Sequence, residues 1–551
     1  MRGRLQTKSY SPPEGGRIAL SANERIAEFL DFAIQAKFAY VNKLTRDART
    51  AFDKEGNSVE KRRINRFCEA AALTLALALL LALTGMGLTE RVHLGTWGGK
   101  TEAVAFMPIS PAWGLALLLG GVLAALALLA LLKRSARLCW ALAALWGALA
   151  VMLAVGFGTK QIYDAAIVQE AAELFARGNY KMMRADYLNA YPYQLGVCLP
   201  METLLRLFPG LNLNLTMQLA NVAMALGQTM FDGERTARAC EAVGLLVWPA
   251  LLFCQQVYGT LPMLFFVSLA LLCYAKYVKT RRRALGAAYA CLMAAAYAMK
   301  INAAVALIAV TICAVLDAIE SGKLEPLAYA ALAIALSLLL MRAVIGQYER
   351  RSGVTLNGGV GALARLTMGL QEGGGAAGWF NRYTERFFPL DVTAQQQHDV
   401  ALADLKARLA QMAQSPARTA AFFREKLCSQ WTEPTMGMIW NGALSEHTGA
   451  LGEAAARFFA REHTALETLL GAFQRAIYAL SAVGIVRMLR DRGRNTLCLL
   501  LPLIFFGGAL YHLIFEAKSQ YAFPYIVLLI PVAAAGLCAL EEQIRKIQGG
   551  K

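Results

Sequence analysis

Long apolar runs alternate with short polar segments along this chain. Two of the clearest runs, 71–88 and 112–132, are long enough to cross a hydrocarbon core of about 30 Å, which takes about 20 helical residues. The pattern predicts an all-α polytopic membrane protein with about 12 transmembrane helices. The spans we expect are 67–88, 111–132, 138–158, 212–230, 241–257, 259–275, 284–299, 301–316, 326–345, 467–486, 495–513 and 522–540.

One further apolar segment, 193–208, does not fit as a full span. It carries Glu202 and Arg206, and counting it as a crossing would invert every later loop. We therefore expect a half-inserted or tilted helix there.

Composition supports a membrane protein. Hydrophobic residues make up 57% of the 551 residues and charged residues 17%, against roughly 45–50% and about 25% in soluble domains. The first apolar block begins near Phe67, after a long polar segment, so we do not expect a cleavable signal peptide.

The positive charges indicate the orientation. Short basic clusters at 133–137, 276–283 and 487–494 lie beside apolar blocks, whereas the long polar stretch 346–466 is nearly balanced, with 12 basic and 11 acidic residues. Basic residues concentrate in cytoplasmic loops, so we expect a bacterial plasma-membrane protein with both termini in the cytoplasm. Binding of nucleic acid would need a basic face on a folded domain. The sequence shows no such face, so we expect no nucleic-acid partner.

The predicted spans divide the chain into four parts: a cytoplasmic amphipathic helical N-terminus (1–66), an N-terminal transmembrane bundle with a catalytic outer loop at 159–211 (67–345), an extracytoplasmic loop region (346–466), and C-terminal transmembrane helices with a short cytoplasmic tail (467–551). The N-terminal helix is expected at 22–52, where apolar residues recur with helical spacing. The loop region is expected to be helical, with its glycine-rich run 358–375 as a mobile lid or linker.

Cysteine and histidine give no sign of a metal site. Most of the eleven cysteines lie inside apolar blocks without a CxxC pair, and the five histidines show no ligand spacing. We expect neither a metal ion nor another cofactor.

The most informative polar pattern follows the third predicted span. Asp164 stands at its outer end and begins an amphipathic helix that Gly178 terminates. A Tyr191-Pro192 turn then leads back toward the membrane. Taken alone, Asp164 is better explained as an N-cap at the interface than as a catalytic residue.

In this layout the chain resembles the GT-C membrane glycosyltransferases, in particular the bacterial glycosyltransferase-39 and RgtA-like branch related to protein O-mannosyltransferases and aminoarabinose transferases. The resemblance rests on 164–196, on the outer-loop run 423–434 and on the late run 515–521. It covers roughly residues 138–540. The chain departs from the family pattern at Ala165, where some relatives have a second acid, and at Gln520, where an arginine is usual.

The resemblance implies transfer of a sugar from a polyprenyl-phosphate donor to a cell-envelope glycan, lipid or protein, on the extracytoplasmic face and among membrane lipids. Asp164 is then the general base that takes the proton of the acceptor, and lysines stabilise the departing phosphate. The expected donor-phosphate residues are Lys300 and Lys518, and the expected substrate-binding residues are Tyr191, Tyr258, Glu516 and Tyr521.

Other interpretations stay open at this point. Lys300 is also explained as a snorkelling side chain, and the tyrosines as part of an aromatic belt. A transporter or lipid flippase would need ionisable residues deep in the spans, and the predicted spans contain almost none at mid-depth. A catalytically inactive homologue acting as a scaffold is a third possibility.

Overall fold

The computed structural model describes residues 57–97, 101–227, 234–491 and 496–549. Residues 62–551 form one compact unit. The amphipathic helix expected at 22–52 lies outside the described residues.

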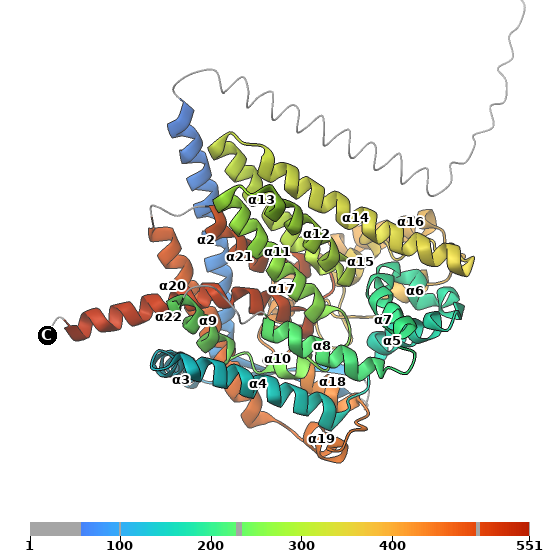
Figure 1. The fold of residues 1–551 in the computed structure, drawn as a ribbon, viewed down its shortest axis with the longest axis horizontal. Helices are drawn as coiled ribbons and strands as arrows, with labels where there is room; N and C mark the ends of the chain where they lie inside the picture. Colours follow the sequence, from blue (N-terminus) through green and yellow to red (C-terminus); the bar gives the residue numbers. More distant parts are fainter. Residues whose placement is uncertain (1–56, 98–100, 228–233, 492–495, 550–551) are drawn as a thin grey trace, which may run out of the picture. The chain divides into compact units, whose positions relative to one another are not determined.

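Helices dominate the architecture (Figure 1). Within the described ranges, nine helices are long and apolar enough to cross a membrane. They are α2 (Asn57–Thr89), α3 (Pro111–Leu132), α4 (Ala136–Phe157), α11 (Thr260–Thr280), α13 (Ala304–Ser321) with the 3-10 turn Ile301–Ala303 before it, α14 (Glu325–Ser352), α20 (Thr464–Arg490), α21 (Leu500–Ile514) with the 3-10 turn Thr496–Leu499 before it, and α22 (Phe523–Gly549). The prediction of an all-α multi-pass membrane protein is confirmed at this level.

The other three predicted spans are shorter. Helix α8 (Leu213–Gly227) has 15 residues, and α12 (Arg283–Met299) has 17. The prediction of one continuous helix over 241–257 is wrong, because α9 (Glu234–Gly244) ends early and α10 (Pro249–Phe253) starts afresh. Proline at 249 has no N–H to continue a helical ladder, and it occupies the first position of α10, where no such N–H is needed.

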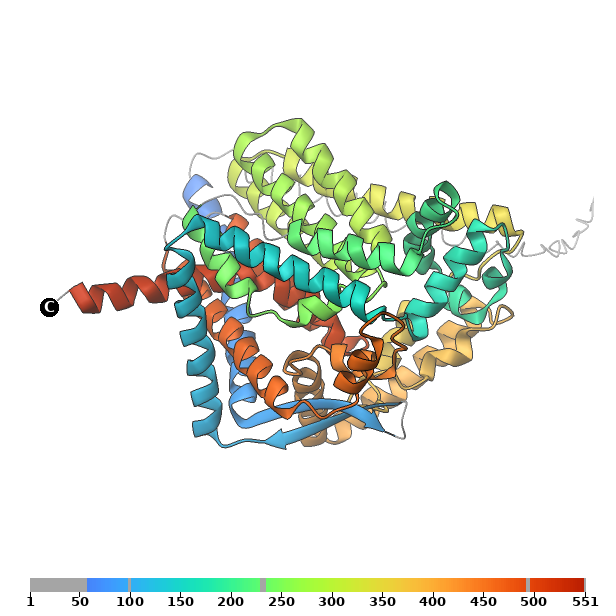
Figure 2. The same cartoon turned by 60° about the horizontal axis from the view of Figure 1, so that its bottom comes forward.

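A β-hairpin interrupts the helical pattern between α2 and α3. Strands β1 (Glu90–Trp97) and β2 (Thr101–Pro108) pair antiparallel, in a stretch we expected only to connect two spans. Val92 and Leu94 are buried on one face, as the two-residue period of a strand requires. The hairpin runs along the lower edge of Figure 2 and contacts α20 and the loop helix α18 (Met438–Leu444).

Shorter helices fill the polar regions. Those before α8 are α5 (Tyr163–Ala176), α6 (Asp186–Ala190) and α7 (Leu195–Leu207), and those after α14 are α15 (Ala362–Gly369), α16 (Ala394–Gln414), α17 (Pro416–Trp431), α18 and α19 (Gly452–Phe459). With 13 residues, α7 is about 20 Å long, less than a hydrocarbon core. Helices α15 to α19 make the region 346–466 largely helical.

The glycine-rich run at 358–375 contacts the site region directly. It contains α15, and its Val360 N–H donates to the carbonyl of Ala190 over 2.8 Å. Gly359 has φ of +82°, and a Cβ there would lie 2.7 Å from Pro192. Only glycine fits where this run crosses the Tyr191-Pro192 turn.

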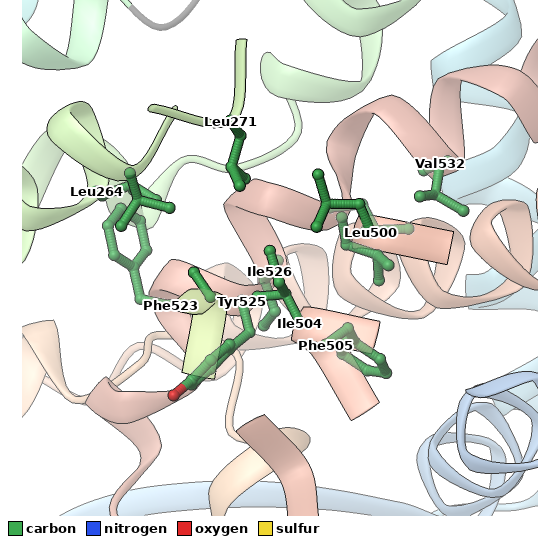
Figure 3. Packing of buried hydrophobic residues seen from close by; sticks show 14 of the residues in the cluster. Leu264, Leu271, Leu500, Ile504, Phe505, Phe523, Tyr525, Ile526 and Val532 are labelled. Atoms are coloured by element: carbon green, nitrogen blue, oxygen red, sulfur yellow. The ribbon is translucent and has the colours of Figure 1, made fainter. Parts of the chain in front are cut away.

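The main apolar core lies where α11, α20, α21 and α22 meet, and Figure 3 shows side chains of three of these helices packed together. Helices α20 and α22 approach most closely through glycine. A Cβ at Gly536 would lie 1.8 Å from the carbonyl oxygen of Leu480, and one at Gly484 would lie 2.2 Å from that of Val532. Small residues of this kind let membrane helices gain backbone contact.

Two of the three basic clusters contact the C-terminal part of α22. Lys133, after α3, pairs with Glu541 of α22, and Arg238 of α9 donates to the carbonyl of Lys133 over 3.3 Å. Arg487 of α20 pairs with Glu542 at 3.3 Å. The clusters at 133–137 and 487–494 therefore lie close together, whereas Arg281 of the third cluster pairs with Asp317.

Candidate functional site

The seven predicted site residues come from five connections at the opposite end of the bundle. Asp164 follows α4, Tyr191 precedes α7, Tyr258 precedes α11, Lys300 lies between α12 and α13, and the segment 516–521 joins α21 to α22. Successive spans run in opposite directions, so these connections fall on the same side. The contacts below show that the structure brings all seven together.

Hydroxyl groups hold the carboxylate of Asp164. The hydroxyl of Tyr258 donates to its Oδ2 over 3.2 Å, and that of Tyr187 lies 3.0 Å from the Tyr258 hydroxyl. Gln194 donates to the Tyr258 oxygen over 2.5 Å. The carboxyl is reachable by solvent yet ringed by protein atoms. That enclosure raises the pKa of Asp164, while Lys518, Tyr258 and Lys300 oppose the rise.

Lys300 lies against two of the predicted tyrosines. Its Nζ donates to Thr260 Oγ1 over 2.9 Å and lies 4.4 Å from the ring centroid of Tyr258 and 6.0 Å from that of Tyr521. Burial lowers the pKa of Lys300 to about 8, against the attraction of Asp164. The amine is therefore a cation at neutral pH, stabilised partly by aromatic faces.

Lys518 forms an ion pair with Glu102 of β2, and its Nζ lies 5.0 Å from the ring centroid of Trp440. Burial alone would lower the pKa of Lys518, but the pairing with Glu102 raises it above its usual value. Sequence reasoning missed Glu102, since a single acid in a segment expected to be a plain connection carries no signal.

Glu516 and Tyr191 complete the predicted set. Tyr521 donates to Glu516 Oε1 over 3.2 Å. Burial raises the pKa of Glu516 to about 7, opposed by Lys518 and reinforced by the charge of Asp164. The hydroxyl of Tyr191 lies 3.4 Å from Thr384 Oγ1, so the region 346–466 reaches the site.

Two buried residues of the run 423–434 hold the neighbouring loops. Lys426 donates to the carbonyls of Gly369 and Phe515, the latter over 2.7 Å, and burial lowers its pKa to about 7. Glu433 accepts the backbone N–H groups of Thr435 and Gly437 over 2.8 and 2.7 Å. Lys426 thereby positions the segment that carries Glu516 and Lys518, and Glu433 closes the loop that follows α17. No spacing rule in the sequence marks either residue.

Tyr163, beside Asp164, has a strained backbone. Its φ of +49° lies in the left-handed region, which costs an aromatic residue about 1–3 kcal/mol. Its ring is stacked on Trp440 with centroids 5.9 Å apart and an interplanar angle of 8°. Strain of this kind persists where the surroundings fix a geometry, here the sharp entry into α5.

The site offers a carboxylate that can act as a general base and ammonium groups that can stabilise negative charge. A carboxylate with a raised pKa lies among two lysine ammonium groups and several tyrosines, at the end of the bundle where α4, α12 and α21 finish. Within the ranges that the structure describes, no three His, Cys, Asp or Glu side chains are placed to hold a metal ion.

Comparison with known proteins gives no match: no protein-family model and no curated protein sequence is similar to this chain.

Proposed function

We propose that this protein is a membrane glycosyltransferase of the GT-C type, which transfers a sugar from a polyprenyl phosphate to a cell-envelope acceptor. One observation carries the proposal: Tyr258 donates to Asp164 over 3.2 Å while Nζ of Lys300 lies 4.4 Å from the ring of the same tyrosine, so a carboxylate and a cation share one tyrosine. Lys518 is near enough to lower the pKa of the same carboxyl. A hydroxyl acceptor needs a base, and a lipid-phosphate leaving group needs cations. The site supplies both.

In the proposed reaction the acceptor oxygen attacks the anomeric carbon of the donor sugar and its proton passes to Asp164. The bond between that carbon and the phosphate oxygen breaks, and the electron pair leaves with the polyprenyl phosphate. Lys300 and Lys518 stabilise the phosphate charge as it develops. Lys518 exchanges its partner Glu102 for the phosphate, and the anion favours the protonated form of Lys300.

A transport function fits the charges less well. A transport path needs ionisable groups along the spans. Arg475, inside α20, instead donates to the carbonyls of Gly87 and Glu90 and so anchors the start of the hairpin. Glu467, in the first turn of the same helix, pairs with His93 of the hairpin at 2.8 Å. Both have structural partners, and the candidate chemistry lies at the helix ends.

The direct test is to incubate the purified protein with a panel of polyprenyl-phosphate sugars and an envelope extract, and to measure released polyprenyl phosphate. We expect one donor to be consumed in a manner that depends on the extract. Heat-inactivated protein is the control. Folded protein that consumes no donor in the panel would contradict the proposal.

The proposal also requires the site to face away from the cytoplasm. A cysteine at exposed Ala407 of α16 is expected to react with a membrane-impermeant maleimide in intact cells, and a cysteine at Arg282, before α12, only after lysis. The parent protein, which keeps its native cysteines, is the control for background labelling. Labelling in the reverse order would put Asp164 in the cytoplasm and rule out the proposed reaction.

A further inference from the structure

A small cavity of about 50 Å³ lies beside the start of α5. Ile162 and Ala165, which line it, flank Asp164 in the chain, and Gln256, which also lines it, donates to Gln520 over 3.3 Å. The cavity therefore lies next to the seven predicted site residues, although none of them lines it.

The cavity walls hold hydrogen-bond donors that the described protein does not satisfy. The side-chain amide nitrogens of Gln255 and Asn441, both lining residues, have no partner within the described ranges, and neither has the indole nitrogen of the adjacent Trp440. Gln255 is only 5% exposed. Buried donors are normally paired, so two on the wall of one cavity indicate that a ligand rich in acceptor oxygens completes the site.

Tyr163, which follows the lining residue Ile162 in the chain, offers an aromatic surface. Tyr163 is 52% exposed, although its ring stacks on Trp440 and its backbone is strained. A tyrosine ring carries negative charge on its face, which suits the weakly positive C–H groups on the flat side of a pyranose. A ligand that combines acceptor oxygens with a C–H face is typically a saccharide.

We propose that this cavity and Tyr163 form the acceptor subsite, and that the acceptor is a saccharide. This inference rests on the glycosyltransferase function proposed above and identifies its acceptor class. The enclosed volume holds a few water-sized groups, too little for a whole hexose. The ring therefore lies on Tyr163, with its hydroxyl groups in the cavity and one hydroxyl directed at Asp164.

A peptide acceptor fits less well. Its backbone carbonyls would also accept from Gln255 and Asn441, so these donors alone do not separate the two acceptor classes. The separation comes from Tyr163, whose exposed ring matches the C–H face of a pyranose and no part of a peptide backbone.

The test is saturation-transfer NMR of the full-length protein in nanodiscs with a panel of methyl hexosides and methyl hexuronosides, and with a capped serine- and threonine-containing peptide. We expect at least one glycoside to bind, and Asn441→Leu to weaken it tenfold or more without lowering Tm, because that amide nitrogen has no partner to lose. Gln414→Leu, an exposed amide at the end of α16, is the matched control and should bind like the parent.

The inference fails if no glycoside binds, if Asn441→Leu binds as well as the parent, or if the peptide alone binds. Donor turnover distinguishes its failure from that of the proposed function. Released polyprenyl phosphate without glycoside binding would overturn only the acceptor class. Glycoside binding that Asn441→Leu removes, in a protein that consumes no donor, would keep the saccharide subsite and overturn the transferase.

Discussion

Asp164→Asn protein is expected to insert and melt like the parent, and to lose about a hundred- to ten-thousandfold of its transfer rate, the usual contribution of general-base catalysis. The amide cannot accept the proton of the acceptor. Asparagine has the same shape as aspartate, and its amide oxygen still accepts from Tyr258, which donates to Asp164 over 3.2 Å.

The fold is expected to tolerate this change for a physical reason. Asp164 lies in the first turn of α5, but the N-cap is Ile162 and no side chain makes a capping hydrogen bond, so the variant loses no helix cap. The variant loses the attraction of the carboxylate for Lys300 and Lys518, but it also removes a charge whose burial raises the pKa of the group. The two effects oppose each other.

Controls for the first prediction come from the same helix. Glu170→Gln and Glu173→Gln lie further along α5 and should keep most of the activity. The parent should lose activity as the pH falls through the raised pKa of Asp164, because the protonated carboxyl cannot act as a base. Parent-like transfer by well-folded Asp164→Asn protein would refute the mechanism.

Lys300→Met is expected to weaken use of the donor about ten- to a hundredfold, since a charge-assisted hydrogen bond to a partly buried phosphate contributes about 1.5–3 kcal/mol. Methionine keeps the apolar contact with the Tyr258 ring and removes the ammonium group. Lys300 is a cleaner target than Lys518, whose removal would leave Glu102 without its cation.

The measurement is the dependence of the transfer rate on donor concentration, with Tm recorded for each variant. Lys406→Met, at an exposed position of α16, is the matched control and should behave like the parent. A Lys300→Met protein with unchanged donor dependence would leave Lys300 as a snorkelling side chain.

Hydrophobic patterning predicted the long helices well because membrane insertion depends on local apolar length. It failed at 241–257, where the average apolarity is high but Pro249 breaks the helix. It also missed the β-hairpin, whose strands are too short and too mixed in polarity to stand out from a loop.

The sequence predicted on which side of the membrane the site residues lie, but not which of them contact one another. Alternating spans place every second connection on one side of a membrane, so Asp164, Lys300 and the segment 516–521 were expected to share a side. Sidedness alone does not determine which side chains touch. The contacts of Lys300 with Tyr258 and of Lys518 with Glu102 follow from how the helices pack.

The hydrophobic pattern was enough to predict a multi-pass membrane protein, the order of its long spans and the end of the bundle that carries the acidic and basic candidates. These properties depend on composition within windows of about 20 residues. Packing was needed to show that Glu102 pairs with Lys518, that Tyr163 is strained against Trp440, and that the amide nitrogens of Gln255 and Asn441, which have no hydrogen-bond partner among the described residues, lie beside one cavity. Two of these features bring together residues that are far apart in the chain, and the third is a backbone angle that only packing stabilises. No local pattern encodes them.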